Sequence, residues 1–303
     1  MIKTVLGEIK QSELGITLAH EHICCFSEYL YRIAGNDYLD KKRLEQVAIS
    51  FLKEMKEKHG LSSIVDCTPV NIGRDIELLK RVSAMAEVNI VSSTGFYYTE
   101  EPLMYNLSAF DICKFIVADA RAVNSGVIKC AVEASELTHF SDKLLRASAK
   151  AHLQTGLPIV LHTNATNKNA LTAIEILLSE GVKPRAITAG HLSDTNNMEF
   201  VKGIARLGCF IGLDRLYSNT SEEYISEKVK TITELCDAGY QDKIILSHDA
   251  LFFNGFDSTP KNCEKPRLTY VFERILPRLK KEVVESVMVQ NPIKMLIKIE
   301  ECK

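Results

Sequence analysis

Eight short apolar segments alternate with longer amphipathic segments along this chain of 303 residues, and this rhythm restricts the folds open to it. Each segment is apolar on both faces, as expected of a parallel strand covered by helices on either side. The expected strands are 16–23, 62–69, 88–95, 127–133, 158–164, 186–192, 209–216 and 243–250. Eight strands alternating with helices over this length predict an α/β fold, a (β/α)8 TIM barrel, with residues 1–303 in a single domain.

The segments between these strands carry apolar residues at every third or fourth position, which is the period of an amphipathic helix. They are 40–60, 73–88, 141–156, 169–181, 198–208 and 221–239, with a weaker pattern over 110–124. Glycines stand where a helix is expected to end, at 60, 156, 181, 208 and 239. An open doubly wound sheet is the alternative, but the glycine-rich turn GxGxxG that usually accompanies it is missing from the sequence.

Composition excludes several classes of protein. The net charge of −2 provides no basic field for nucleic acid, and no apolar run approaches the roughly 20 residues of a membrane span. The nine cysteines are odd in number and form no CxxC pair, which indicates reduced, buried thiols and a cytoplasmic protein. No partner among nucleic acids or membranes is therefore expected.

The first expected strand ends in the motif LAHEHI, which contains His20 and His22. Side chains two apart on a strand point to the same face, so the two imidazoles should stand side by side. Such a pair can arise by chance, act as a pH-sensitive pair, or supply two ligands to one metal ion.

Other titratable residues also follow or end the expected strands. Lys129 lies in the fourth, His162 in the fifth and His191 in the sixth, and Asp249 closes the eighth. Active sites of such barrels are assembled at the carboxyl ends of several strands at once. Four histidines and one carboxylate gathered there predict a site for a divalent metal ion. A buried polar network without metal would leave several desolvated groups hard to satisfy.

Lys129 does not fit a plain metal site, because a divalent cation repels an ammonium group. Three interpretations stay open on the residues alone. The side chain can be a structural lysine paired with an acid such as Glu133, or a nucleophile that forms a Schiff base. It can also be carboxylated by CO2, which would make it an anionic ligand that bridges two metal ions.

Several motifs resemble those of the phosphotriesterase family of the amidohydrolase superfamily, and in particular its lactonase branch. They are TLAHEHI, NIGRDIELL, STGFYY, VIKCA, TGLPIVLHTNA, AGHLSDTNN, IGLDRL and ILSHD, and the similarity spans nearly the whole chain. The resemblance implies two divalent metal ions, with zinc favoured and manganese or cobalt as alternatives. His20, His22 and Asp249 would bind the buried ion, and His162 and His191 the more exposed one. Lys129, as N6-carboxylysine, and a hydroxide would bridge them.

The same resemblance implies a hydrolase that opens a lactone ring. Tyr97 falls where the lactonase branch carries a tyrosine, and Arg215 where that branch carries an arginine. The implied reaction is attack by the metal-bridging hydroxide, with Asp249 accepting its proton and Tyr97 orienting the substrate. Tyr97 can also be a plain pocket wall, and Arg215 a salt bridge to Asp214 or Asp257. A phosphotriesterase or phosphodiesterase acting on organophosphate esters is the alternative.

Residues of the loop after the eighth expected strand are compatible with two types of lactone. Phe252, with Phe253 and Phe256, can line a channel for the acyl tail of an N-acyl-homoserine lactone. The cations at 261, 265 and 267 can instead hold the phosphate of a phosphorylated sugar lactone. A non-catalytic metal-binding barrel and a Schiff-base aldolase are the alternatives from other classes. The expected partner is a small lactone or ester, and members of this family often form homodimers.

Overall fold

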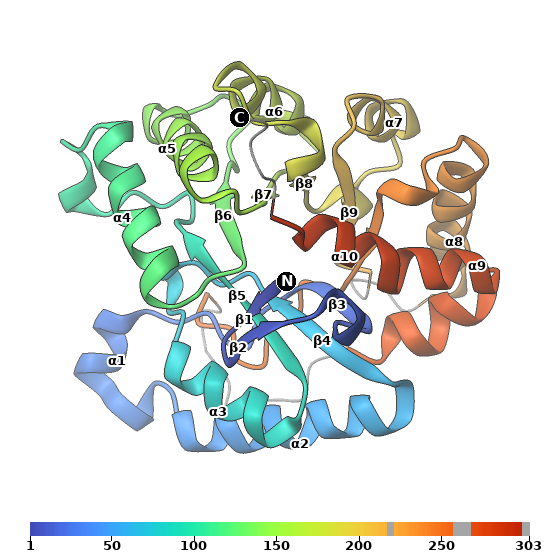
Figure 1. Ribbon diagram of the computed structural model, residues 1–303, viewed down its shortest axis with the longest axis horizontal. Coiled ribbons are helices and arrows are strands. Elements are labelled where there is room, and N and C mark those ends of the chain that lie inside the picture. Colours follow the sequence, from blue (N-terminus) through green and yellow to red (C-terminus); the bar gives the residue numbers. More distant parts are fainter. Residues whose placement is uncertain (217–220, 257–267, 299–303) are drawn as a thin grey trace.

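A computed structural model describes residues 1–216, 221–256 and 268–298. Its centre is a sheet of eight parallel strands, in which each strand pairs with the next one along the chain (Figure 1). The strands are β3 (Ile16–Glu21), β4 (Leu61–Asp66), β5 (Asn89–Gly95), β6 (Val127–Ala131), β7 (Ile159–His162), β8 (Ile187–Ala189), β9 (Phe210–Leu213) and β10 (Ile244–Leu246). All eight lie within or overlap the predicted segments, so the predicted (β/α)8 barrel is confirmed.

The first and last strands of the barrel meet just beyond the end of β10. The backbone N–H of Asp249 donates to the carbonyl of His20 at 3.0 Å, and that of His22 donates to the carbonyl of Ala250 at 2.9 Å. These two hydrogen bonds join residues that lie 229 and 228 positions apart in the sequence. The barrel therefore closes through the predicted ligand residues themselves.

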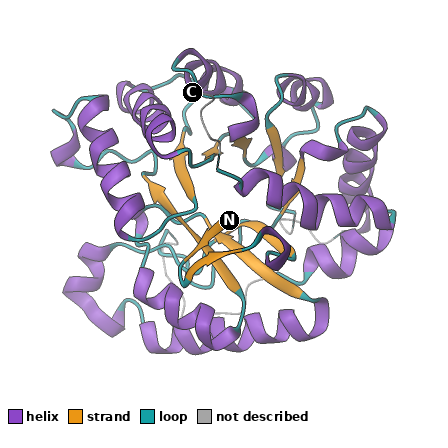
Figure 2. Cartoon of the chain, viewed as in Figure 1, coloured by secondary structure: helices purple, strands orange, loops and turns teal. Residues whose placement is uncertain are grey.

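Helices surround the strands (Figure 2). They are α2 (Lys41–His59), α3 (Ile76–Ala86), α4 (Ala109–Ala122), α5 (His139–Thr155), α6 (Asn169–Ser179), α7 (Met198–Arg206) and α8 (Glu222–Asp237). Every predicted helix is present, and α4 corresponds to the weaker pattern. The glycines expected to end helices at 60, 156, 181, 208 and 239 all adopt positive φ angles, a backbone conformation that costs glycine little. Within the described ranges, no helix has the length and apolar composition required to cross a bilayer.

The sequence did not predict several short elements. They are the hairpin β1 (Ile2–Thr4) and β2 (Gly7–Ile9), and the helices α1 (Glu28–Ala34), α9 (Lys281–Glu285) and α10 (Asn291–Leu296). Short 3-10 turns occur at η1 (Gln11–Glu13), η2 (Gly35–Asp37), η3 (Val70–Ile72), η4 (Pro102–Met104), η5 (Pro184–Ala186), η6 (Leu192–Asp194), η7 (Gln241–Lys243) and η9 (Leu276–Arg278). Two π-helical turns, η8 (Val271–Ile275) and η10 (Ser286–Gln290), lie near the C-terminal end. Elements of three to seven residues are too short to show a hydrophobic period.

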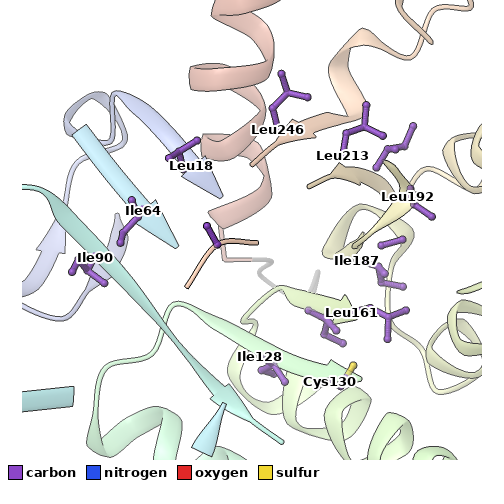
Figure 3. Close-up of a cluster of buried hydrophobic side chains, with 14 of the residues drawn as sticks. Leu18, Ile64, Ile90, Ile128, Cys130, Leu161, Ile187, Leu192, Leu213 and Leu246 are labelled. Carbon is purple, nitrogen blue, oxygen red and sulfur yellow. The ribbon is translucent and has the colours of Figure 1, made fainter. Parts of the chain in front are cut away.

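Apolar side chains fill two regions. One cluster packs the strands against the helices and includes Leu18, Ile64, Ile90 and Leu161 (Figure 3). The other combines alternate, inward-facing strand residues with side chains from β1, from α10 and from the segment before β3. Its members are Ile2, Leu14, Ala19, Val65, Cys67, Val91, Val127, Val160, Phe210, Ile245, Met295 and Leu296. Toward the carboxyl ends of the strands, the inward-facing residues are polar. The barrel interior is therefore apolar at its bottom, and the titratable side chains gather at its carboxyl-terminal mouth.

A bulge in β3 sets the direction of His20. Leu18 pairs with Ile64, yet Glu21 pairs with Asp66, so β3 holds one extra residue between these two points. Leu18 belongs to the outer cluster and Ala19 to the inner one, and without the bulge His20 would follow Leu18 outward. Bulges are used next to active sites to re-aim a side chain. Here the bulge brings His20 to the barrel interior beside His22.

Candidate metal centre

The predicted ligand side chains converge at the carboxyl ends of the strands. His20 is the last but one residue of β3, and His22 lies one residue past this strand. His162 is the last residue of β7, while His191 and Asp249 stand two and three residues beyond β8 and β10. The four histidines are 0–6% exposed. The extended backbone stops before His191 and Asp249 because both adopt left-handed conformations, with φ angles of 64° and 54°.

His20, His22 and Asp249 form the first ligand group. Oδ1 of Asp249 lies 3.0 Å from Nε2 of His22 and 3.5 Å from Nε2 of His20. One atom from each side chain can therefore reach a single metal ion. Two neutral imidazoles and a carboxylate are a ligand set that zinc and similar divalent ions accept.

His162 and His191 form the second group. Nδ1 of His162 and Nε2 of His191 face each other at 2.7 Å. Both nitrogens can act as ligands to one ion that replaces this hydrogen bond. The other ring nitrogen of His162 is held by Glu133, whose carboxylate lies 2.8 Å away.

Burial keeps His20 and His162 in the neutral form that binds metal. His22 differs: although burial opposes it, Cys25 and Asp249 raise the pKa of His22 to about 10, so metal binding there would displace a proton. Burial, reinforced by the positive charge of Lys129, lowers the pKa of His20 to about 3. Burial, with His191 as the second cause, lowers the pKa of His162 to about 3. Both rings are therefore neutral at pH 7, as metal ligation requires.

Lys129 lies between the two groups, in β6. Its side chain is 1% exposed, and Nζ is 2.7 Å from Nε2 of His20. Among the described residues, no carboxylate lies within ion-pair distance of Nζ, and Glu133 binds His162 and Asn164 instead. Pairing of Lys129 with Glu133 is therefore not observed. Burying an ammonium group without an anionic partner costs free energy.

Asp214 connects the two groups, and sequence reasoning missed it in this role. Its Oδ2 is 2.7 Å from Nδ1 of His20, and its Oδ1 is 2.8 Å from Nδ1 of His191. The carboxylate is 1% exposed. It is hydrogen-bonded to Nδ1 of His191 and lies within ion-pair distance of Nδ1 of His20, so it favours the tautomers that leave each Nε2 for the metal. The signal was available, because Asp214, like Asp249, is a carboxylate placed directly after an apolar strand.

Arg215 holds Asp249. Its Nε donates to Oδ2 of Asp249 at 2.8 Å, and its Nη1 donates to Asp194 at 2.9 Å. These partners differ from Asp214, which had been considered for Arg215 on sequence grounds, and Asp257 lies outside the described residues. Although burial opposes it, the charge of His191 and the hydrogen bond of His22 hold the pKa of Asp249 well below its usual range. Asp249 is therefore ionised at neutral pH.

Glu21, the central residue of the HEH motif, fixes the segment that carries Asp249. Its carboxylate accepts hydrogen bonds from the backbone N–H groups of His248 and Ala250, at 2.8 and 2.9 Å. It also accepts from the hydroxyl of Ser247 at 2.8 Å. These contacts lie on the face of β3 opposite to the ligands, so Glu21 positions a ligand without binding the metal.

Of the residues predicted to contact substrate, Tyr97 lies near a predicted metal ligand, whereas Phe252 does not. The ring of Tyr97 is 5.2 Å from that of His162 and 5.9 Å from that of Phe256. Phe252 is 3% exposed and packs against Phe51 of α2, so it lies in the core and away from the ligands. The cations at 261, 265 and 267 lie outside the described residues.

A cavity of about 680 Å³ lies near the first ligand group, and no ligand side chain is among the residues that line it. Phe256, Phe96 and Cys25 are among its walls. Sγ of Cys25 is 3.7 Å from Nδ1 of His22, so the cavity wall touches the edge of this ring opposite to Nε2. The walls are mostly apolar.

Fold and site together define a (β/α)8 barrel with a histidine–carboxylate group suited to metal ions. The chain belongs to the phosphotriesterase family, whose model matches residues 1–296. It is 32% identical to an aryldialkylphosphatase of Saccharolobus solfataricus, over 94% of this chain and 96% of that protein. It is 30% identical to a phosphotriesterase homology protein of Mycobacterium tuberculosis, over 96% of each chain. It is also 24% identical to human N-acetyltaurine hydrolase, over 96% of each chain.

The position of Asp214 leads to a prediction about metal binding. In an Asp214→Asn variant the single amide oxygen can accept from only one of the two Nδ1–H groups, so one histidine loses its orientation. We expect metal affinity to fall about 10–100-fold. Calorimetric titration of the metal-free protein with Zn2+ measures the dissociation constant of the metal. Asp194→Asn, which alters a carboxylate outside both groups, is the control, and equal affinities for the two variants would contradict the role of Asp214.

Proposed function

We propose that the protein is a hydrolase that opens a lactone ring with the help of two divalent metal ions, zinc being favoured. His20, His22 and Asp249 would hold one ion, His162 and His191 the other, and carboxylated Lys129 would contact both. Bound there, the ions would supply Lewis acidity and an activated water.

In this proposal Asp249 accepts a proton from water and returns it to the leaving oxygen. Its Oδ2 is held by Arg215, while its Oδ1 faces the ligand histidines. A guanidinium has no acceptor atom and stays protonated, so it cannot draw the proton away from Asp249. Arg215 favours the ionised carboxylate, so Asp249 would pass a proton on readily to the leaving oxygen.

The contact between Asp249 and Arg215 is the observation that carries the proposal. The alkoxide released from a lactone is a strong base and requires a proton, whereas an aryloxide leaves more readily without one. A carboxylate placed to pass a proton to the leaving oxygen thus favours an ester ring as substrate. Tyr97 supports the same conclusion, because burial raises the pKa of its phenol and keeps it protonated, as a hydrogen-bond donor beside His162.

The residues that line the cavity near the first ligand group support one kind of substituent on the lactone. Phe26, Ile72, Phe96 and Met104 are among its walls, and they offer contacts to an acyl chain rather than to a phosphate. We therefore favour a lactone with an apolar tail, such as an N-acyl-homoserine lactone, over a phosphorylated sugar lactone.

A phosphotriesterase is the second candidate. It is supported by the relative from Saccharolobus solfataricus, which is named an aryldialkylphosphatase and covers almost the whole chain. The two candidates differ in the leaving group that Asp249 has to protonate.

A substrate panel separates the candidates. With Zn2+-, Mn2+- and Co2+-loaded enzyme, we expect kcat/KM to be higher for N-acyl-homoserine lactones than for an aryl dialkyl phosphate or a sugar lactone phosphate. Phe256→Ala should lower kcat/KM for long-tailed lactones about 10-fold, through loss of roughly 1.5 kcal/mol of apolar contact, and leave tail-free lactones unchanged. Met85→Ala, which changes an exposed side chain on α3, is the control. A higher kcat/KM for the phosphate ester would contradict the lactonase proposal and support a phosphotriesterase instead.

A further inference from the structure

The loop after β5 carries Tyr97, and one side chain from another loop contacts it at two points. Tyr97 and Thr99 follow Gly95, the last residue of β5. Oδ1 of Asn71 accepts a hydrogen bond from the backbone N–H of Tyr97 at 2.7 Å. Nδ2 of Asn71 donates to the backbone carbonyl of Thr99 at 3.2 Å. One amide therefore contacts the main chain on both sides of Tyr98.

The two ends of the Asn71 amide match the two backbone groups that they contact. A loop residue has no neighbouring strand to satisfy its backbone groups, and buried groups left unpaired cost free energy. In the described part of the chain, no second group forms a hydrogen bond with the N–H of Tyr97 or the carbonyl of Thr99. A carboxamide offers one acceptor oxygen and one donor nitrogen, so the partners also fix which end is which.

The loop that carries Asn71 is attached to β5 at both of its ends. Asn71 lies in η3, between Thr68 and Arg74. The hydroxyl of Ser93 donates to the carbonyl of Thr68 at 2.8 Å, and Nη1 of Arg74 donates to the carbonyl of Ser93 at 2.8 Å. Both ends of the loop are therefore held by one residue of the strand that leads to Tyr97.

Arg74 makes this attachment rigid. Its guanidinium forms a bidentate pair with Asp119 of α4, with both N–O distances 2.7 Å, and its side chain is 7% exposed. Asp119 also accepts from the hydroxyl of Thr94 at 2.6 Å. Bidentate, charge-assisted pairs are strong and geometrically specific. Asn71 therefore projects from a rigid support.

Tyr97 lies between this support and the second ligand group. Its ring packs edge-on against that of His162, at 5.2 Å and 77°, and lies 4.3 Å from the ring of Tyr98. Apolar contact is non-directional, so these rings alone do not fix where the phenol hydroxyl lies. The hydrogen bond to Asn71 fixes the backbone from which the Tyr97 side chain projects.

We propose that Asn71 is a positioning residue, which holds the loop after β5 so that the hydroxyl of Tyr97 faces the substrate. This inference rests on the role proposed above for Tyr97 as a hydrogen-bond donor. Among the described residues, Asn71 forms no hydrogen bond with a predicted metal ligand, so it acts on the reaction through Tyr97. Displacing an orienting group by about 1 Å can cost up to about 10²-fold in rate, and we expect about 10-fold for Asn71→Ala.

A double-mutant cycle tests whether Asn71 acts through the Tyr97 hydroxyl. The value of kcat/KM is measured for the wild type, Asn71→Ala, Tyr97→Phe and the double variant, on the ester of the panel above that the wild type hydrolyses fastest. Each single variant should lose about 10-fold, and the double variant no more than about 2-fold beyond Tyr97→Phe. Losses that multiply to about 100-fold, or a single variant as active as the wild type, would overturn the proposal.

The matched control is Asn89→Ala. Asn89 is the first residue of β5, at the opposite end of the strand, and its amide donates to the carbonyl of Glu13 at 3.2 Å. This variant should keep the kcat/KM of the wild type. Elemental analysis should find the same metal content in every variant, and a lower content in Asn71→Ala would overturn the proposal, because Asn71 would then act on the ligands.

Hydrogen exchange tests the contact of Asn71 with Tyr97 without a substrate. The chain has 10 tyrosines, so 15N-tyrosine labelling restricts the NMR spectrum to their amides, and the signal missing from Tyr97→Phe belongs to residue 97. In Asn71→Ala this amide should exchange about 5–10-fold faster, because one hydrogen bond of ordinary strength is lost. Asn71→Asp keeps an acceptor and should exchange as slowly as the wild type.

The two proposals fail in different ways. Equal exchange of the Tyr97 amide in the wild type and in Asn71→Ala would overturn the role of Asn71, whatever the substrate is. Hydrolysis of the phosphate ester in preference to every lactone would overturn the proposed function, and the cycle measured on that ester would still decide whether Asn71 acts through Tyr97.

Discussion

Replacement of Asp249 by asparagine is expected to remove most hydrolysis and leave the fold intact. An amide cannot accept the proton that the ionised carboxylate takes from water, and groups of this kind contribute about 10²–10⁴-fold to rate. The asparagine keeps the size of the side chain and can still accept from Arg215. We therefore expect kcat to fall by about that factor in enzyme saturated with metal.

The control for this variant is Asp194→Asn, at the other end of the Arg215 guanidinium. Asp194 contacts Arg215 at 2.9 Å and belongs to neither ligand group, so its loss should cost less than about 10-fold in rate. Circular dichroism and elemental analysis establish that both variants are folded and loaded. A kcat near that of the wild type for Asp249→Asn would exclude the proposed proton transfer.

Replacement of Lys129 by alanine is expected to lower the metal content from about two ions per chain to one or fewer. Lys129 is the residue between the two groups, and in the proposed site its carboxylated form would supply an anionic ligand beside the imidazoles and Asp249. Hydrolysis should fall by about 10²-fold or more, because both ions are required together. Elemental analysis after dialysis measures the content.

The matched control is Lys143→Ala, which removes another buried lysine whose ammonium binds the backbone of Met104 and Tyr105 rather than a ligand residue. It should reduce thermal stability and leave metal content unchanged. Loading of the wild type with labelled bicarbonate should transfer one labelled carbon to the chain, and Lys129→Ala should take up none. Trapping of a carbonyl substrate on Lys129 by borohydride would instead support the Schiff-base interpretation.

The sequence predicted the barrel because its strands are buried on both faces and its helices have a clear period. Leu18, Ile64 and Ile90 are apolar toward the helices, and Ala19 and Val65 toward the interior, so each strand reads as one apolar run. The hairpin β1–β2 and helix α1 are too short to leave such a signal. They depend on tertiary contacts.

The ligand positions were predictable because each is a polar residue at the end of an apolar run, where barrel sites are built. The bulge that turns His20 inward could not be predicted, because the pattern LAHEHI allows its histidines on either face of the strand. Asp214 was overlooked as a positioning residue because its two partners, His20 and His191, lie on distant strands. Likewise, the contact of Phe252 with Phe51 depends on how α2 packs.

The left-handed backbone at His191, Arg215 and Asp249 limits how this site can diversify. Their φ angles of 64°, 60° and 54° are tolerated by glycine and asparagine, and are strongly disfavoured by valine, isoleucine and threonine. The side chain at position 215 contacts both Asp249 and Asp194. β-Branched residues are disfavoured there by the backbone conformation, even where space is available. Libraries that alter specificity here gain most from unbranched or amide residues, and new apolar surface is better introduced at Phe256 or Tyr97, whose φ angles are negative.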